Sequence, residues 1–352
     1  MRFSIVIPVF NRPDEVDELL QSLQSQSCKD FEVIIVEDGS SIPCQKVVQH
    51  YEDSLPIHYY IIENSGPAGA RNFGIGKAKG DYIIFFDSDC LIPQGYFEAV
   101  EKALAETNAD AFGGPDRAHS SFSDVQKAIN YSMTSFFTTG GIRGGKQKMD
   151  KFYPRSFNMG IKREAINQLG GFSKMRFGED IDLSIRIVKA GYKSCLFSEA
   201  WVYHKRRTDL KKFFKQVTNS GIARINLYKK YPESLKLVHL LPAVFTIGVF
   251  FLALLFIIGV LVGTAIQTGI INPDPPFGLM ICTAALLPLL LFSLIIFIDA
   301  AIKNKSIKIG ILSVAASFIQ LLGYGSGFLR AWWKRCIKKE GEFEAFKKNF
   351  YK

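Results

Sequence analysis

The sequence predicts an α/β protein with a doubly wound, mostly parallel sheet, followed by an α-helical membrane region. In the amino-terminal part, apolar runs of strand length alternate with amphipathic segments, an alternation typical of strand–helix–strand units with right-handed crossovers. Further along, three stretches contain no Asp, Glu, Lys or Arg, and each is about as long as the roughly 20 residues that cross a bilayer core. These stretches are residues 240–263, 277–298 and 309–329.

The first strand is predicted at residues 3–10, FSIVIPVF, because an unbroken apolar run is typical of a strand buried on both faces. An amphipathic helix should follow, since its apolar side chains repeat at i, i+3, i+4 and i+7. These side chains are Val16, Leu19, Leu20 and Leu23. Further strands are expected at 31–41 (FEVIIVEDGSS), 57–64 (IHYYIIEN) and 82–90 (YIIFFDSDC).

Two of these strands end in acids, in EDGS and DSD, at the edge where open α/β sheets place their ligands. In an extended backbone, Asp87 and Asp89 point to the same side. Two carboxylates that close repel each other unless a cation lies between them, and Mg²⁺ or Mn²⁺ prefers oxygen ligands. The alternative is a helix N-cap or an Asx-turn, because Asp and Ser are also common turn residues.

The distribution of charge disfavours a nucleic-acid-binding protein, and the spacing of the cysteines disfavours a disulfide-stabilised or zinc-binding one. The net charge is +10, and residues 303–352 hold eleven Lys or Arg against three Glu, which gives +8 beside the apolar segments. This distribution fits the positive-inside bias and attraction to anionic lipid better than nucleic-acid binding. The six cysteines show no CxxC pairing, so neither a disulfide framework nor a zinc site is expected.

Six motifs resemble those of inverting family 2 glycosyltransferases, in the order that family has them. They are IVIPVFNR, VIIVEDGS, GPAGARNFG, FFDSD, GGF…FGED and VYH, and the resemblance covers about residues 3–225. It implies a GT-A nucleotide-sugar-binding fold, a nucleotide-sugar donor that is commonly a UDP-sugar, and Mn²⁺ or Mg²⁺ as cofactor. The glycines of GPAGARNFG do not form GxGxxG, which disfavours a nicotinamide cofactor.

The resemblance also implies roles for single residues on the donor side. Asp89 and Asp87 match the metal motif, and His204 matches a histidine near the metal, although a lone His is often structural. The donor would be held by residues in the first four motifs, namely Pro8, Asp38, Arg71 and Asp87. Asp38 could instead form an Asx-turn, and Arg71 could be a solvated residue at the start of a helix.

On the acceptor side, FGEDIDLSIRIVKAG predicts a helix with acids in its first turn, where they are ordinary dipole partners. The resemblance indicates Asp180 as the general base that takes the acceptor's proton, with Glu179 as the competitor. Asn158 is expected to contact a sugar. Arg206 and Arg207 either bind phosphates or form a basic face against the membrane.

The expected domains are a cytoplasmic catalytic domain at 1–232, a membrane region at 233–335 and a basic cytoplasmic tail at 336–352. The start of the chain is charged too early for a signal peptide. Residues 120–151 should form a mobile loop near the acceptor. The loop TGIINPDPPFG lacks Lys and Arg and suits the outer face, whereas DAAIKNKSIK suits the cytoplasm. We therefore expect two crossings plus a re-entrant or interfacial third segment, with three crossings as the alternative.

These observations predict a metal-dependent hexosyltransferase of the cytoplasmic membrane that uses a nucleotide sugar. Its acceptor would be a membrane-associated, lipid-linked saccharide in surface polysaccharide or glycoconjugate assembly. The first alternative is a polyprenyl-phosphate sugar synthase, and the second is a non-catalytic nucleotide-binding scaffold. The absence of QxxRW disfavours a processive polymerase, and charge-free spans disfavour a transporter.

Overall fold

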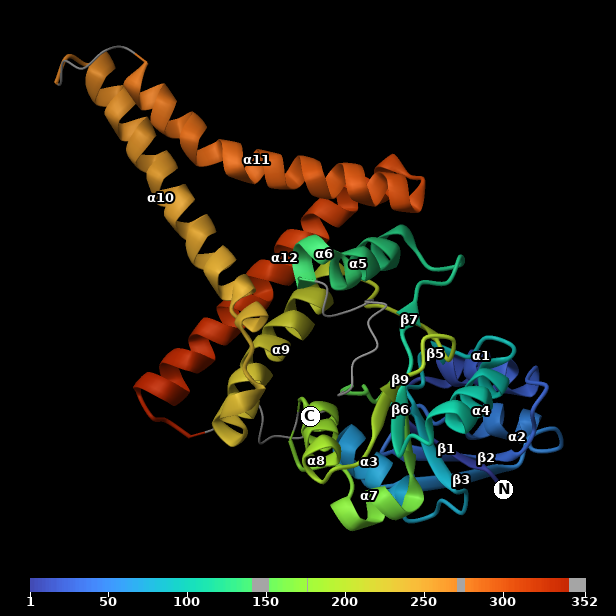
Figure 1. Ribbon diagram of the computed structural model, residues 1–352. Helices are drawn as coiled ribbons and strands as arrows, with labels where there is room; N and C mark the ends of the chain where they lie inside the picture. Colours follow the sequence, from blue (N-terminus) through green and yellow to red (C-terminus); the bar gives the residue numbers. More distant parts are fainter. Residues whose placement is uncertain (141–151, 176, 271–275, 342–352) are drawn as a thin grey trace. The chain divides into compact units, whose positions relative to one another are not determined.

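The computed structural model describes residues 1–140, 152–175, 177–270 and 276–341 (Figure 1). These residues form two compact units, one of residues 1–121 and 152–205 and the other of residues 122–140 and 206–341. The expected catalytic domain, 1–232, thus contributes residues to both units. The part of the basic tail at 342–352 lies outside the described residues.

The first unit is built on a seven-stranded sheet with the order β3-β2-β1-β4-β8-β6-β9. The first four of these strands are mutually parallel, and β8 is antiparallel to both β4 and β6. The mostly parallel, doubly wound sheet that the sequence predicts is therefore confirmed. The strands are β1 (Phe3–Val9), β2 (Phe31–Asp38), β3 (Ile57–Ile62), β4 (Tyr82–Phe86), β6 (Ala111–Gly113), β8 (Asn158–Lys162) and β9 (Ser194–Leu196).

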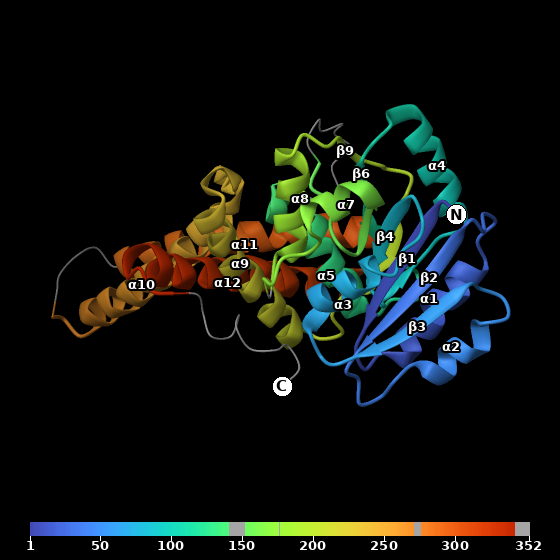
Figure 2. The ribbon, with the colours of Figure 1, turned by 90° about the horizontal axis from the view of Figure 1, so that it is seen from below.

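Helices cover both faces of this sheet (Figure 2), because alternate residues of each strand point to opposite faces. In β1, Ile5 and Ile7 pack on one face and Val6 packs on the other. The first face carries α1 (Pro13–Gln24), α2 (Gln45–Tyr51) and α4 (Tyr96–Thr107). The second face carries α3 (Gly66–Ile75), α7 (Arg163–Leu169) and α8 (Glu179–Lys189).

A second, three-stranded sheet in the same unit has the order β5-β10-β7. Its strands are β5 (Cys90–Leu91), β10 (Val202–His204) and β7 (Asp116–Arg117). In the antiparallel pair β5–β10, His204 lies opposite Cys90. This small sheet therefore brings a residue from late in the chain beside the DSD segment at the end of β4.

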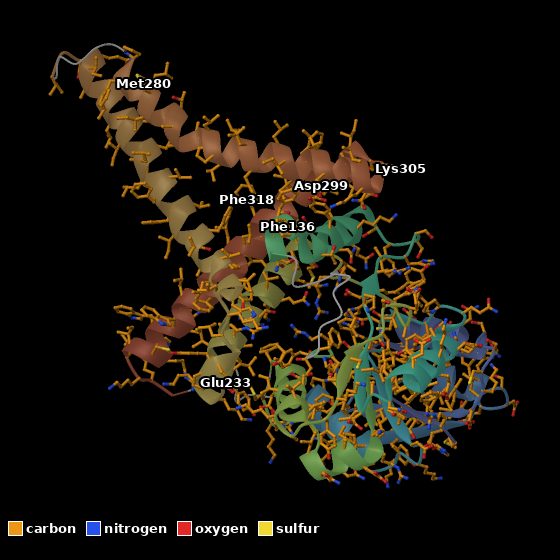
Figure 3. All side chains as sticks on the ribbon, viewed as in Figure 1. Phe136, Glu233, Met280, Asp299, Lys305 and Phe318 are labelled. Carbon is orange, nitrogen blue, oxygen red and sulfur yellow. The ribbon has the colours of Figure 1, made fainter. Side chains whose placement is uncertain are left out.

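The second unit contains three helices that are long and apolar enough to cross a membrane. They are α10 (Leu241–Gln267), α11 (Phe277–Asn304) and α12 (Ile307–Trp332). Figure 3 labels Met280 near one end of α11 and Asp299 and Lys305 near the other. The rings of Phe245, Phe292 and Phe318, one from each helix, lie with centroids 5.2–5.7 Å apart.

Two helices outside the apolar stretches, α5 (Asp124–Thr134) and α9 (Leu210–Lys230), also belong to the second unit and pack on α12. The helices α5 and α6 (Phe136–Thr139) replace the first half of the loop expected at 120–151, and its part at 141–151 lies outside the described residues. α5 forms because Ser123 and Gln126 make a capping box at its start.

The third apolar segment is one continuous helix, so it lacks the reversal that a re-entrant segment needs. Its backbone lies close to that of α9: a Cβ atom added to Gly327 would lie 2.1 Å from the carbonyl oxygen of Thr218. A Cβ added to Gly221 of α9 would likewise lie 2.1 Å from the carbonyl oxygen of Tyr324. Glycine at these positions is what allows the two helices to approach so closely.

Candidate functional site

Three of the residues expected on the donor side lie at the carboxyl edge of the parallel strands in the first unit. Asp38 is the last residue of β2, Asp87 directly follows β4, and Pro8 lies one residue before the end of β1. Because β1, β2 and β4 are parallel neighbours, their carboxyl ends meet at one edge. The strand order thus brings together the residues that the sequence predicts for the donor side.

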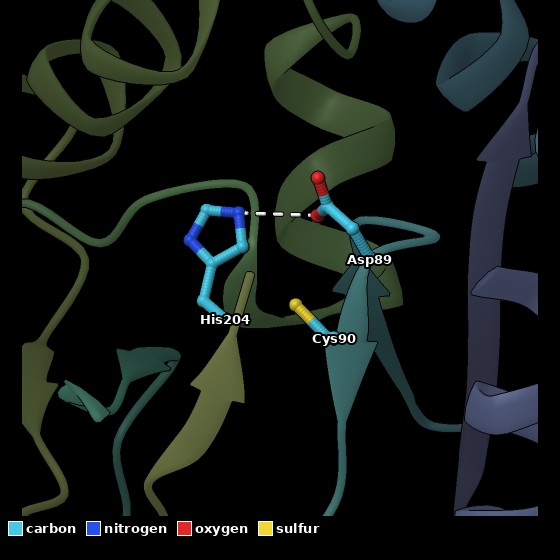
Figure 4. A group of neighbouring side chains, drawn as sticks. All are labelled: Asp89, Cys90 and His204. Atoms are coloured by element: carbon cyan, nitrogen blue, oxygen red, sulfur yellow. Dashed lines mark ion pairs between the residues drawn. The ribbon is translucent and has the colours of Figure 1, made fainter. Parts of the chain in front are cut away.

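Asp89 and His204 form the centre of this site (Figure 4). The imidazole Nε2 of His204 lies 3.2 Å from Oδ1 of Asp89 and 3.9 Å from Oδ2 of Asp87. The imidazole ring stacks on Phe157 with a centroid distance of 4.8 Å, which fixes the ring plane. Two carboxylates and an imidazole nitrogen that converge in this way suit a divalent cation such as Mn²⁺. The residues therefore fit the metal that the resemblance implies.

Cys90 also lies beside this group, and its Sγ falls within 4.8 Å of ligand atoms of Asp89 and His204. Burial raises the pKa of its thiol well above the ordinary value, and the nearby carboxylate of Asp89 raises it further. The thiol donates to the carbonyl oxygen of Phe157 at 3.5 Å. Carboxylate oxygens suit a hard cation better than a thiol does, so Asp89 and Asp87 are the better candidate ligands.

Arg71 connects the two acidic motifs of the site. Its Nη2 lies 2.6 Å from Oδ1 of Asp87, and its Nη1 lies 3.1 Å from Oε1 of Glu179. Burial acts to lower the pKa of Arg71, but Asp87 and Glu179 together raise it above the ordinary value. The side chain of Arg71 is only 4 % exposed, and its guanidinium lies over the ring of Phe172. These contacts make Arg71 a clamp that joins α3, the end of β4 and the start of α8.

Glu179 and Asp180 begin α8 but have different surroundings. Burial and, to a smaller extent, the neighbouring Asp180 raise the pKa of Glu179 to about 7, against the lowering effect of Arg71. Asp180 is more open to solvent, with 15 % of its side chain exposed, and its Oδ2 lies 3.4 Å from Nη1 of Arg155. The Glu179 side chain is 11 % exposed, so the two acids differ less in exposure than in their partners, Arg71 for Glu179 and Arg155 for Asp180.

Asp38 is buried and is held by the loop before α3. Its Oδ1 accepts hydrogen bonds from the backbone N–H of Ser65 at 2.7 Å and from its hydroxyl at 3.1 Å. Asn64 donates to the backbone oxygen of Asp38 at 2.9 Å. Asp38 thus connects the end of β2 to the start of α3, and its contact with a nucleotide stays a prediction.

The expected sugar contact of Asn158 does not agree with its surroundings. Its side chain is buried, its Oδ1 accepts from the hydroxyl of Tyr96 at 2.6 Å, and its Nδ2 donates to the carbonyl oxygen of Ala200 at 2.8 Å. Both ends of the amide are therefore used to hold three segments of the core together. Sequence reasoning assigned Asn158 to the acceptor because a single polar residue in a motif does not reveal its burial.

Arg206 and Arg207 lie in the second unit, so the structure does not place them at this site. Arg206 is buried, and its Nε and Nη2 lie 3.2 and 3.1 Å from the side-chain oxygen of Asn130 in α5. Gln126 of α5 donates to the backbone oxygen of Arg206 at 2.9 Å. These contacts favour a structural role for Arg206, whereas Arg207 is half-buried and its role stays a prediction.

Two arginines at the site were not found from the sequence. Arg155 lies beside Asp180, as described above, and Nη1 of Arg12 lies 2.9 Å from Oδ2 of Asp89. Arg12 is the last residue of the motif IVIPVFNR, but nothing in that motif indicates which side chain it meets. Pairing across loops depends on the tertiary fold, which local sequence patterns do not describe.

A family model and several curated proteins match the amino-terminal part of the chain. The family model for Glycosyl transferase family 2 matches residues 4–170. The GalNAc(5)-diNAcBac-PP-undecaprenol β-1,3-glucosyltransferase of Campylobacter jejuni is 32 % identical over 115 residues, covering 32 % of this chain and 37 % of that protein. The pre-mycofactocin glycosyltransferase of Mycobacterium tuberculosis is 27 % identical over 236 residues, covering 65 % of this chain and 48 % of that protein.

Other curated relatives are similar over shorter parts of their length. An uncharacterised glycosyltransferase of Rickettsia bellii is 36 % identical over 107 residues, which are 30 % of this chain and 16 % of that protein. The matches to these three relatives thus span less than half of each relative's length.

A solved structure extends the similarity over most of the chain. The mannosyltransferase PcManGT of Pyrobaculum calidifontis, in complex with GDP-Man and Mn²⁺, has a TM-score of 0.54 at 16 % identity, covering 93 % of this chain and 87 % of that one. This likeness confirms the GT-A fold that the resemblance implied. Residues 4–170 therefore correspond to a Glycosyl transferase family 2 domain.

Proposed function

We propose that this protein is a membrane-anchored, inverting glycosyltransferase that moves a hexosyl group from a nucleotide sugar, such as a UDP-sugar, to a membrane-associated acceptor. One observation carries the proposal: Asp87, Asp89 and His204 converge at the carboxyl edge of the sheet, and the clamp residue Arg71 connects them to the acidic start of α8. Open α/β sheets bind their ligands at this edge. Such an arrangement suits a donor diphosphate on one side and an acceptor on the other.

Asp89, His204 and Asp87 would hold Mn²⁺ or Mg²⁺, which when bound supplies positive charge opposite the leaving diphosphate. Arg71 holds the Asp87 carboxylate in place from the buried side. Asp180 accepts the proton of the acceptor hydroxyl as that oxygen forms its bond to the anomeric carbon. The bond between that carbon and the diphosphate oxygen breaks in the same displacement, so the anomeric configuration inverts and no covalent enzyme intermediate is needed.

The apolar helices support an acceptor that resides in the membrane. Three helices are long and apolar enough to cross a bilayer, and the C. jejuni relative is named for an undecaprenol-linked acceptor. We therefore assign the acceptor to the lipid-linked saccharides of surface polysaccharide or glycoconjugate assembly. The catalytic residues would then lie on the cytoplasmic side of the inner membrane, because nucleotide sugars are made in the cytoplasm.

One contact favours the second candidate, a polyprenyl-phosphate sugar synthase. Arg155 lies 3.4 Å from Asp180, where its guanidinium could bind an anionic acceptor. A phosphate acceptor is already ionised and needs no general base. The two candidates therefore differ in the chemical task that they give to Asp180.

The test is a panel of nucleotide sugars incubated with the full-length protein, membrane lipid extract and Mn²⁺ or Mg²⁺. We expect metal-dependent release of nucleoside diphosphate, which should be lost in excess chelator and in Asp89→Ala. The control is Asp53→Ala, which removes an exposed aspartate. Equal release in chelator would contradict the metal site. Donor binding without turnover under every condition would instead indicate the non-catalytic scaffold.

A further inference from the structure

Each carboxylate of the DSD pair has an arginine of its own. Arg71 lies 2.6 Å from Asp87, and Arg12 lies 2.9 Å from Asp89. The two arginines differ in mobility, because the side chain of Arg71 is 4 % exposed whereas that of Arg12 is 33 % exposed. Arg71 is held among packed side chains, but Arg12 can leave its carboxylate without disturbing the core.

The turn that carries Arg12 is fixed, although the side chain is not. The preceding residue, Asn11, has a φ of +53°, a left-handed conformation that Asn tolerates better than most residues. Its backbone N–H donates to the hydroxyl of Ser40 at 2.8 Å, and its side-chain oxygen accepts from the N–H of Ile42 at 2.8 Å. The loop after β2 thus anchors the turn from which the Arg12 side chain reaches Asp89.

A second acid keeps the guanidinium near the site. Oε1 of Glu15, one turn further along α1, lies 3.6 Å from the same Nη1 of Arg12. Arg12 therefore stays close to Asp89 even when their contact breaks. It can reach a new anion nearby without a change in the backbone.

The charges explain why this contact should break. Each of the two carboxylates already has a cationic partner before a metal ion arrives, and each arginine also contacts a second acid, Glu15 or Glu179. A divalent cation that binds the carboxylates places further positive charge beside the arginines, and a diphosphate offsets that charge. Arg12 also contacts Oδ2 of Asp89, on the carboxylate that the cation needs. A cation alone must therefore compete with Arg12, whereas a cation that arrives with a diphosphate offers Arg12 another partner.

We propose that Arg12 is a movable counter-ion that makes the binding of cation and nucleotide diphosphate cooperative. Without nucleotide it pairs with Asp89 and weakens cation binding; with nucleotide it turns to the diphosphate and frees the carboxylate. By linkage, the nucleotide strengthens cation binding by the same factor as the cation strengthens nucleotide binding. This inference depends on the proposed function, because it presupposes the metal and the nucleotide donor.

The test is a Mn²⁺ titration of the full-length protein in detergent, followed by electron paramagnetic resonance of free Mn²⁺, with and without saturating UDP or GDP. In the parent protein the nucleotide should strengthen Mn²⁺ binding by about tenfold or more. Arg12→Met removes the charge and keeps most of the length. It should bind Mn²⁺ alone several-fold more tightly than the parent, and most of the cooperativity should be lost. Arg12→Lys, which keeps the charge, should retain part of it.

The matched control is Arg2→Met. Arg2 is at the opposite end of β1, is 36 % exposed and also pairs with two acids, Asp81 and Glu101. Its substitution should leave Mn²⁺ binding unchanged. Equal or weaker Mn²⁺ binding by Arg12→Met without nucleotide would overturn the inference and leave the proposed function intact. A parent protein that binds no Mn²⁺ under either condition would overturn the metal site itself, and with it this inference.

Discussion

At the scale of single residues, the two acids that begin α8 have different tasks. Asp180 is the more exposed of the pair, and Glu179 is held by Arg71. If Asp180 is the general base, Asp180→Asn should lower the release of nucleoside diphosphate by about 10²–10⁴-fold. Donor binding, measured by calorimetry with UDP- and GDP-sugars, should change little, because the proposed mechanism gives this side chain a task on the acceptor alone.

The comparison variant for this prediction is Glu179→Gln. A larger loss of turnover in Glu179→Gln than in Asp180→Asn would transfer the role of base to Glu179. Nearly full turnover in Asp180→Asn, with labelled sugar recovered on polyprenyl phosphate, would favour the synthase instead. The first outcome identifies the general base, and the second identifies the chemistry of the acceptor.

Glu179 should also make stability depend on pH. Burial raises its pKa from 4.5 to about 7 in the folded state. Since the folded pKa is the higher one, its stabilising contribution is complete below pH 4.5 and is lost as the pH rises through 7. In metal-free buffer, the melting temperature of the parent should therefore fall by at least about 2 °C more than that of Glu179→Gln between pH 5.5 and 8.5. Parallel melting curves would contradict this assignment.

At this scale, the sequence could predict a contact between side chains when a motif indicates it, but not when the contact depends on how distant loops fold. The strand expected at 82–90 ends at Phe86, and Asp87 and Asp89 lie in the turn before β5, where the backbone N–H of Cys90 donates to the carbonyl oxygen of Asp87 at 3.1 Å. The extended-chain argument therefore does not explain why the two acids converge, whereas the motif order did place His204 near them. The partners of Asp89 and Asp180, Arg12 and Arg155, come from loops whose paths are set by distant anchors. No periodicity in the sequence encodes such contacts.

At the scale of elements, the long strands were predicted because each is an unbroken apolar run between polar turns. The strands β5, β7 and β10 have only two or three residues each and therefore no period that a sequence could reveal. The residues of α5 and α9 fall within the catalytic domain expected at 1–232, and those of α5 were expected to form part of a loop. Both helices pack on α12 through their apolar side chains, which share one core cluster with those of α12. The order of the segments in the sequence does not show this packing.

The close approach of α9 and α12 gives a prediction at this scale. A side chain at Gly327 would collide with the backbone of Thr218, so Gly327→Leu should force the two helices apart. Overpacking of this kind costs about 1–3 kcal/mol. We expect a lower melting temperature in detergent, measured by intrinsic fluorescence.

The matched control is Gly248→Leu in α10, where an added Cβ would meet nothing within 4 Å. Its melting temperature should stay close to that of the parent. Equal melting temperatures for the two variants would show that α9 and α12 are not held at this distance.

At the scale of the whole molecule, the second unit determines how the chain meets the membrane. α9 carries lysines near both ends, which disfavours a position in the bilayer core. Because α12 packs along α9, that part of α12 should lie near the water boundary. The exposed rings of Trp332 and Trp333, beside Arg330 and Lys334, suit the headgroup region.

We therefore predict that α10 and α11 cross the membrane and that α12 is an interfacial helix with both ends on the cytoplasmic side. Single cysteines at Ile270 and Lys339, introduced after the six native cysteines are replaced, would be treated in intact cells with a membrane-impermeant maleimide. Ile270→Cys should be labelled from outside, and Lys339→Cys should react only after permeabilisation. This arrangement keeps the basic residues after α12 inside, as the positive-inside rule favours. Labelling of Lys339→Cys from outside would show three crossings, and α9 would then need a water-filled or protein-lined path for its lysines beside α12.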